Sequence, residues 1–355
     1  MRPPTPPRPA GAPGAGDDPS DDLARTATFD HGIAAPAAAP IETDPERLGR
    51  FRVVGRLGRG GMGVVYEAVD PAGGEHVAIK TLQALGPERL YRFKREFRAL
   101  TRIQHPNVVV LHELASDGEH MFFTMELVRG VDFVQALCGP PRPDGSHVPC
   151  TNYKRLREAM RQLAAGVHAI HGAGIMHRDI KPSNVLVTAS GRVVLLDFGL
   201  VREHGVNDQV GVTAHGAMLG TPLYMAPEQT GSGEVGPAAD WYAVGGLLYQ
   251  ALTGRPPYRG LGVLGMLAAK QEGPPEPPSA RGLRVPIELE HLCQTLLQPD
   301  PTLRPTGDEI VRAFGASDID AIAVADSGVH FLGRAAELAV LHEALAITAD
   351  GTPAV

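Results

Sequence analysis

The stretch His177-Arg178-Asp179-Ile180-Lys181-Pro182-Ser183-Asn184 places a carboxylate, an ammonium group and an amide side by side. Two β-branched runs, 185–187 and 193–196, come next and predict a hairpin. That hairpin returns Asp197-Phe198-Gly199 to the neighbourhood of Asp179 and Asn184. Protein-bound Mg²⁺ prefers oxygen ligands and substrate phosphates, so Asn184 and Asp197 suit it. Asp179 is then left to orient a hydroxyl nucleophile.

A glycine cluster lies far upstream of this stretch. Residues 58–63 read Gly-Arg-Gly-Gly-Met-Gly, a GxGxxG pattern that is a weak signal on its own. In a dinucleotide-binding fold the pattern opens a helix, but here residues 64–69 follow, and they favour a strand. A β-hairpin that folds over phosphates therefore fits better than a Rossmann turn. We expect glycine here because a Cβ would keep the backbone away from phosphate oxygens.

Lys80 ends the next predicted strand, and only five of the 33 basic residues are lysine. A helix is predicted after it from the spacing of its apolar residues. Glu96 falls on the apolar face of that helix, where a carboxylate is costly unless it is paired. Lys80 is the natural partner, although a buried glutamate of purely structural value stays open on these residues alone. The apolar positions are Leu90, Phe93, Phe97, Leu100 and Ile103.

Taken together and in order, these motifs resemble a Hanks-type protein kinase of the serine/threonine branch, over residues 51–314. The resemblance includes a VAIK-like strand at 77–80, Ala-Pro-Glu at 226–228, Asp240 before Trp241, and the segment 300–305, whose arginine would pair with Glu228. It implies an α+β, bilobal fold. The N-lobe (51–128) would be a small antiparallel β-sheet with one main helix, and the C-lobe (129–314) would be mostly helical.

The resemblance also implies roles for single residues. Asp179 would be the base that accepts the substrate hydroxyl proton, and Lys181 would neutralise charge on the γ-phosphate. Lys80, tied to Glu96, would grip the α- and β-phosphates of ATP, and Asn184 with Asp197 would hold Mg²⁺. The implied ATP site comprises Leu57, Gly58, Arg59, Gly60, Gly61, Met62, Gly63, Val64, Val65, Ala78, Lys80, Met125, Glu126, Val128 and Leu186.

Regulation is implied by the loop between Asp197 and Glu228. Thr213 is a candidate phosphorylation site, and Arg178 would pair with its phosphate and order the loop. Thr221 belongs to a segment that resembles a serine/threonine docking loop, which would place it near Asp179. His177 and Phe198 are expected to serve packing rather than chemistry.

Two rival functions remain open at this stage. A small-molecule phosphotransferase of kinase-like fold usually lacks the Ala-Pro-Glu segment and a lysine in the place of Lys181. An ATP-binding pseudokinase or scaffold module would normally have lost Lys80, Asp179 or Asp197, and all three are present. A serine/threonine protein kinase that autophosphorylates, with proteins as its substrates, is therefore the favoured function.

Composition excludes several other classes. A formal net charge of −7 argues against a nucleic-acid binder driven by bulk charge. The sequence contains no apolar run long enough to predict a membrane span. Its three cysteines, Cys138, Cys150 and Cys293, form no paired framework, which favours reduced thiols in a cytoplasmic protein.

Both ends of the chain differ from the kinase-like part. Residues 1–45 hold ten of the 32 prolines and an acidic cluster, which predicts a disordered tail. A linker is predicted at 315–330. Residues 331–355 begin Phe-Leu-Gly-Arg-Ala-Ala-Glu-Leu and resemble the opening of an AAA/STAND-type ATPase module, without its phosphate loop. We therefore expect the chain to be the front part of a longer protein, and a helix that docks on the kinase is the alternative.

Overall fold

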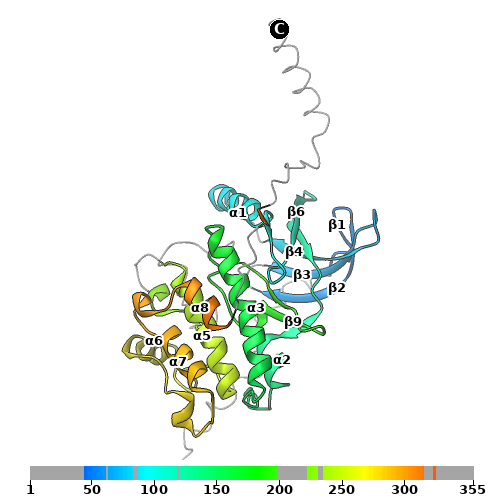
Figure 1. Ribbon diagram of the computed structural model, residues 1–355. Helices are drawn as coiled ribbons and strands as arrows, with labels where there is room; N and C mark the ends of the chain where they lie inside the picture. The colour runs from blue at the N-terminus through cyan, green and yellow to red at the C-terminus, as the bar shows by residue number, and fades with distance from the viewer. Residues whose placement is uncertain are drawn as a thin grey trace, which may run out of the picture.

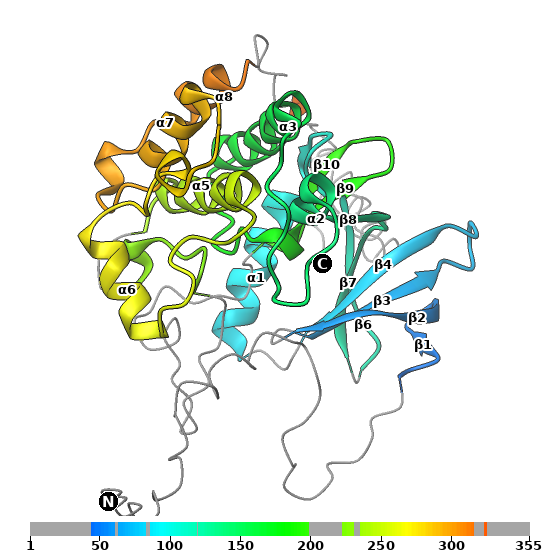
Figure 2. The same ribbon diagram turned by 90° about the horizontal axis from the view of Figure 1, so that it is seen from below.

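The computed structural model describes residues 44–60, 63–82, 86–118, 120–198, 222–230, 235–315 and 323–324. The chain forms a β-sheet part and a helical part (Figure 1). In the view turned by 90°, the sheet again lies on one side and the helices coloured yellow to orange on the other (Figure 2). This arrangement confirms the α+β, two-lobed fold that the motifs predicted.

The N-terminal sheet has six strands in the order β1-β2-β3-β4-β7-β6, all antiparallel to their neighbours. Its main helix is α1 (Pro87–Leu100), with Pro87 at the first helical position, where its missing N–H costs nothing. The six strands are β1 (Arg47–Leu48), β2 (Phe51–Gly60), β3 (Gly63–Val69), β4 (His76–Leu82), β6 (Leu111–Ser116) and β7 (Met121–Glu126).

The C-terminal part is built on α3, which lies next to the three-stranded sheet β10-β9-β8. Its remaining regular elements are short strands and a group of helices. They are β8 (Gly130–Asp132), α2 (Phe133–Cys138), α3 (Tyr153–Gly172), β9 (Val185–Thr188), β10 (Val193–Leu195), α5 (Ala238–Thr253), α6 (Val263–Glu272), α7 (Ile287–Leu296) and α8 (Gly307–Ala313).

Sequence signals set the ends of the long helices. Asn152 caps α3, because its side chain accepts a hydrogen bond from Arg155 N at 3.0 Å. Gly174 follows α3 with φ +75°, and Gly254 ends α5 with φ +73° in the left-handed region that glycine favours. The predicted hairpin is confirmed as β9 and β10, with Val187 opposite Val193.

One apolar core joins the two parts. The rings of Phe93 and Phe97 on α1 lie 6.1 Å and 5.7 Å from that of Phe123 on β7, which fixes the helix to the sheet. Ile103 was predicted to continue this helix, but α1 ends at Leu100 and Ile103 lies in β5 (Ile103–Gln104), which pairs with β11 (Ala323–Val324). Ile103 fitted the helical spacing of the apolar residues because a buried residue just past the end of a helix can still continue that spacing.

Candidate active site

The loop after α3 is held by one carboxylate from α5. Asp240 is 2% exposed, and its Oδ1 accepts from Arg178 N at 2.7 Å. Its Oδ2 accepts from His177 N at 2.8 Å and lies 2.8 Å from His171 Nε2. Burial raises the pKa of Asp240, but the His171 contact and the backbone donor outweigh it, so this pKa lies below its usual value. Arg178 has φ +62°, a conformation rare outside glycine, and its fixed N–H helps maintain it.

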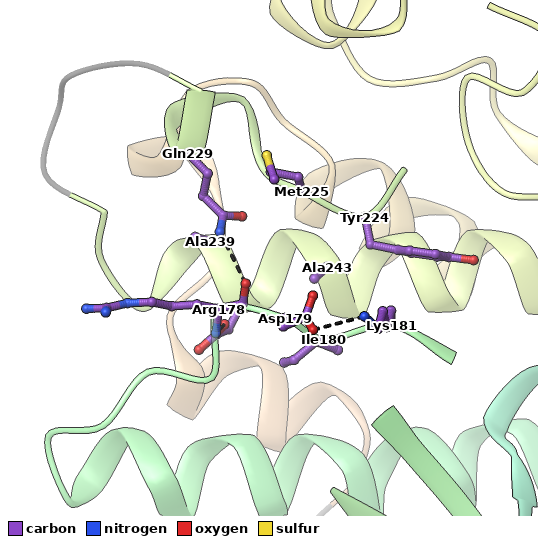
Figure 3. Close-up of a pocket in the computed structure, with 10 residues that line it drawn as sticks. Arg178, Asp179, Ile180, Lys181, Tyr224, Met225, Gln229, Ala239 and Ala243 are labelled. Atoms are coloured by element: carbon purple, nitrogen blue, oxygen red, sulfur yellow. Dashed lines mark hydrogen bonds and ion pairs between the residues drawn. The ribbon is translucent and has the colours of Figure 1, made fainter. Parts of the chain in front are cut away.

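This anchored loop brings three predicted site residues together. Lys181 Nζ lies 3.0 Å from Asp179 Oδ2, and Asn184 Nδ2 donates to the same oxygen at 3.1 Å and to Asp179 O at 2.8 Å. Figure 3 shows Asp179 and Lys181 on one segment of a pocket, facing a second segment that carries Tyr224 and Met225. A hydroxyl group that entered this pocket would meet a carboxylate and an ammonium group together.

The hairpin delivers Asp197 beside this loop, as predicted. Leu196 N donates to Asn184 O at 2.8 Å, which ties the two segments together. Asp197 has φ +52°, so its backbone is also in the left-handed region. His177 is fully buried and its ring lies 5.4 Å from that of Phe198, which agrees with a packing role for both.

The expected pair between Lys80 and Glu96 is not formed. Lys80 Nζ lies 2.8 Å from Asp197 Oδ1 instead. Glu96 is half-buried on α1, and burial raises its pKa while the positive charge of Arg178 opposes that rise. The prediction failed because the position of Glu96 on the helix shows only that its carboxylate needs a cation. That position does not show which cation the packing of α1 brings close to Glu96.

Asp197 Oδ1 is buried, and the contact that the described residues give it is the ion pair with Lys80 Nζ at 2.8 Å. An oxygen in this condition fits a cation ligand. Asn184 supplies a second protein oxygen, because its amide nitrogen is used by Asp179. These two residues therefore fit Mg²⁺, which takes few protein ligands and completes its shell with phosphates and water.

The predicted nucleotide site lies along β2, β3, β4 and β7. Val65 pairs with Lys80, and Ala78 pairs with Met125, so these four side chains share one region of the sheet. Gly63 has φ +143°, and a Cβ there would lie 1.8 Å from Thr81 O. Glycine is therefore required at this position by the neighbouring strand. Gly61 and Met62 lie outside the described residues, as do Thr213 and Thr221.

Comparison with known proteins decides the family. Residues 51–314 match the protein kinase domain family. The chain belongs to the protein kinase family. It is 37% identical over 282 residues to the serine/threonine-protein kinase Pkn1 of Myxococcus xanthus, covering 76% of this chain and 39% of Pkn1. It is 33% identical over 269 residues to PknA of Mycobacterium tuberculosis, covering 72% and 58%. The chain thus spans two fifths to three fifths of the length of these two relatives.

Solved structures agree with this assignment. A crystal structure of Rad53 in complex with AMP-PNP superposes with a TM-score of 0.61 at 26% identity, covering 74% of this chain and 64% of that one. The kinase domain of Mycobacterium tuberculosis PknI gives 0.55 at 24% identity, covering 76% and 97%, and shows the likeness of fold alone.

The ion pair expected from the kinase resemblance between Glu228 and residue 304 is confirmed. Arg304 Nη1 and Nη2 lie 2.6 Å and 2.8 Å from the two carboxylate oxygens of Glu228, a bidentate geometry. Arg304 also donates to Ala238 O and Pro299 O. The pair therefore joins the Ala-Pro-Glu segment to the start of α5.

Some contacts of this kinase domain were missed from sequence. Arg192, directly before β10, contacts both carboxylate oxygens of Glu126 at 2.5 Å and 3.1 Å and donates to Pro106 O. It thereby links the chain between the two lobes to the β9–β10 hairpin, and no local pattern signals a contact across so many residues.

Among the described helices, none combines the length and hydropathy that crossing a bilayer requires.

Proposed function

We propose that this chain is a serine/threonine protein kinase that transfers the γ-phosphoryl group of ATP to protein hydroxyls. The observation that carries the proposal is the contact of Asp179 with Lys181 at one pocket (Figure 3), together with the hydrogen bond from Asn184 to the same carboxylate. The naming of Pkn1 and PknA as serine/threonine-protein kinases supports it, as does the AMP-PNP bound to Rad53.

Each residue has a task that its position allows. Asp179 accepts the proton of the substrate hydroxyl, and Lys181 orients that carboxylate. Asn184 and Asp197 would hold Mg²⁺, which when bound neutralises charge on the phosphates. Lys80 lies beside Asp197, where an ammonium group can reach the same phosphates. We assign Glu96 no part in holding Lys80.

The test is Asp179→Asn in the full chain, assayed with labelled ATP and a panel of serine, threonine and tyrosine peptides. The variant should lose transfer by about 10²–10⁴-fold, the contribution of a positioned base, while ATP affinity is retained. Asp308→Asn, which changes an exposed carboxylate on α8, is the matched control. Transfer at the parent rate by Asp179→Asn would show that the base is assigned wrongly.

The same assay separates the rival functions. A pseudokinase would bind ATP and transfer no phosphate, and a small-molecule phosphotransferase would act on small acceptors but on neither peptides nor itself. Phosphosite mapping by mass spectrometry then shows whether Thr213 or Thr221 is modified, which stays a prediction. The cytoplasmic location stays a prediction as well.

We further propose, from the sequence 331–355 alone, that an ATPase module follows the kinase domain. These residues lie outside the described part of the chain. An open reading frame that continues into GxxxxGK[ST] would support the proposal, and a stop codon directly after residue 355 in the intact gene would contradict it.

A further inference from the structure

A buried lysine lies behind the pocket, on α6. Lys270 is 0% exposed, although lysine is among the residues least often buried. Its Nζ donates to three main-chain carbonyls, Pro222 O at 2.6 Å, Leu223 O at 3.0 Å and Met225 O at 2.6 Å. All three protons of the ammonium group are therefore used, and all three go to one short segment.

No carboxylate forms an ion pair with Lys270 in the part of the chain that the structure describes. Besides the carbonyls, it faces two phenol rings, Tyr242 on α5 at 5.4 Å and Tyr258 after α5 at 6.0 Å. Arg304, paired with Glu228, lies 4.9 Å from the Tyr242 ring. A buried charge without a counter-ion is costly, so it persists only where dipoles such as these carbonyls compensate it.

The segment that Lys270 holds, residues 222–225, is here called the pocket wall. Tyr224 and Met225 of the pocket wall line the pocket that also contains Asp179 and Lys181 (Figure 3). The pocket wall is not part of a helix or strand, so its carbonyls have no ladder partners. Its position relative to Asp179 therefore depends on donors from outside, and Lys270 supplies them.

We propose that Lys270 is a positioning residue for the protein substrate, which holds the pocket wall in place through the charged form of its side chain. The proposal rests on the proposed kinase function and adds a determinant of substrate binding to it. A neutral amine has two protons for three carbonyls, so loss of one proton leaves a buried carbonyl unpaired and loosens the pocket wall.

The direction of a pH effect follows. Burial lowers the pKa of Lys270 to about 7, and the carbonyls favour its charged form. Burial raises the pKa of Tyr242, and it raises that of Tyr258 to about 12, so both facing phenols stay neutral. The pocket wall is therefore held below about pH 7 and is released as the pH rises through that value. The contribution of Lys270 to the free energy of unfolding has the opposite pH dependence. It rises with pH above about pH 7, because the unfolded chain then binds more protons at this group than the folded chain does.

The experiment compares the full chain with Lys270→Met and with the control Lys154→Met, which removes an exposed lysine on α3. Peptide KM, ATP KM and kcat are measured between about pH 6 and pH 8. Hydrogen exchange is followed in the peptide that covers residues 222–226. We expect Lys270→Met to raise peptide KM by about tenfold or more at low pH, since buried carbonyls lose charged donors. ATP KM should change by less than about twofold, because the predicted nucleotide contacts lie on the sheet.

In the parent, peptide KM should rise with pH toward the value of Lys270→Met, and exchange at 222–226 should rise with it. Unchanged peptide KM and unchanged exchange in Lys270→Met would overturn the proposal, as would an equal loss in both KM values. If Lys270→Met does not fold, Lys270→Gln, which keeps two donors, takes its place. A peptide KM in Lys270→Gln equal to that of the parent overturns the proposal. The exchange readout needs no catalysis, so a parent that transfers no phosphate refutes the proposed function and leaves the role of Lys270 to be decided separately.

Discussion

Replacing Asp240 by asparagine tests how the catalytic loop is held. The substitution keeps the shape of the side chain but removes the charge and turns one accepting oxygen into a donating amide. In the better rotamer the remaining oxygen serves His177 N and His171, and the new amide faces the N–H of Arg178. Two donors then point at each other in a fully buried place.

The cost follows from these contacts. A buried N–H without a partner costs about 1–3 kcal/mol, and the two surviving bonds lose a charged acceptor, so we expect a loss of about 2–4 kcal/mol in unfolding free energy. The left-handed backbone of Arg178 offsets part of this loss, because a residue strained by about 1–2 kcal/mol relaxes when its N–H is released. Relaxation moves Asp179, so kcat should fall by at least about tenfold.

Urea unfolding, titration with ATP and a peptide assay measure the three consequences. ATP affinity should stay within about twofold of the parent, because Asp240 contacts the loop and His171 on α3 and none of the strands of the predicted nucleotide site. Since the pKa of Asp240 is lowered in the folded state, its contribution is present above the unfolded pKa and disappears as the pH falls through the folded value. The stabilities of parent and variant should therefore begin to converge only as the pH falls below about 4. If Asp240→Asn keeps the stability and kcat of the parent at neutral pH, the reasoning is refuted. The control Asp308→Asn should change neither quantity appreciably.

Two further changes have expected outcomes. Arg304→Gln leaves Glu228 without its buried partner and should lower the free energy of unfolding, measured in urea, by about 3–5 kcal/mol. The double variant with Glu228→Gln should recover part of this loss. Equal effects of the single and double variants would contradict the pairing. Arg192→Ala removes a partly exposed contact with Glu126 and should cost only about 0.5–1 kcal/mol while raising ATP KM less than about threefold, and a loss as large as that of Arg304→Gln would contradict this ranking.

The fold could be predicted because its signals are local and ordered along the chain. The glycine cluster, the strand that contains Lys80 and the hairpin after Asn184 each follow from residue type and spacing, although that strand continues to Leu82. What could not be predicted are contacts between distant segments. Asp240 reaches His177 across 63 positions, and Arg192 reaches Glu126 across 66. No periodicity within either segment encodes the other.

Glu96 and Lys270 show where one physical rule succeeds and where it stops. Both are ionisable groups on helices and are partly or fully buried, and such a group must find a partner. For Glu96 the rule correctly indicated that the carboxylate needs a partner. It did not identify that partner, because the structure places Lys80 beside Asp197. For Lys270 no such signal was present, because the apolar residues of α6 mark no single face and only the structure shows that Met266 and Lys270 are buried. There the partners are main-chain carbonyls, which carry no sequence signature. In this chain the backbone that Lys270 holds borders the pocket of Asp179.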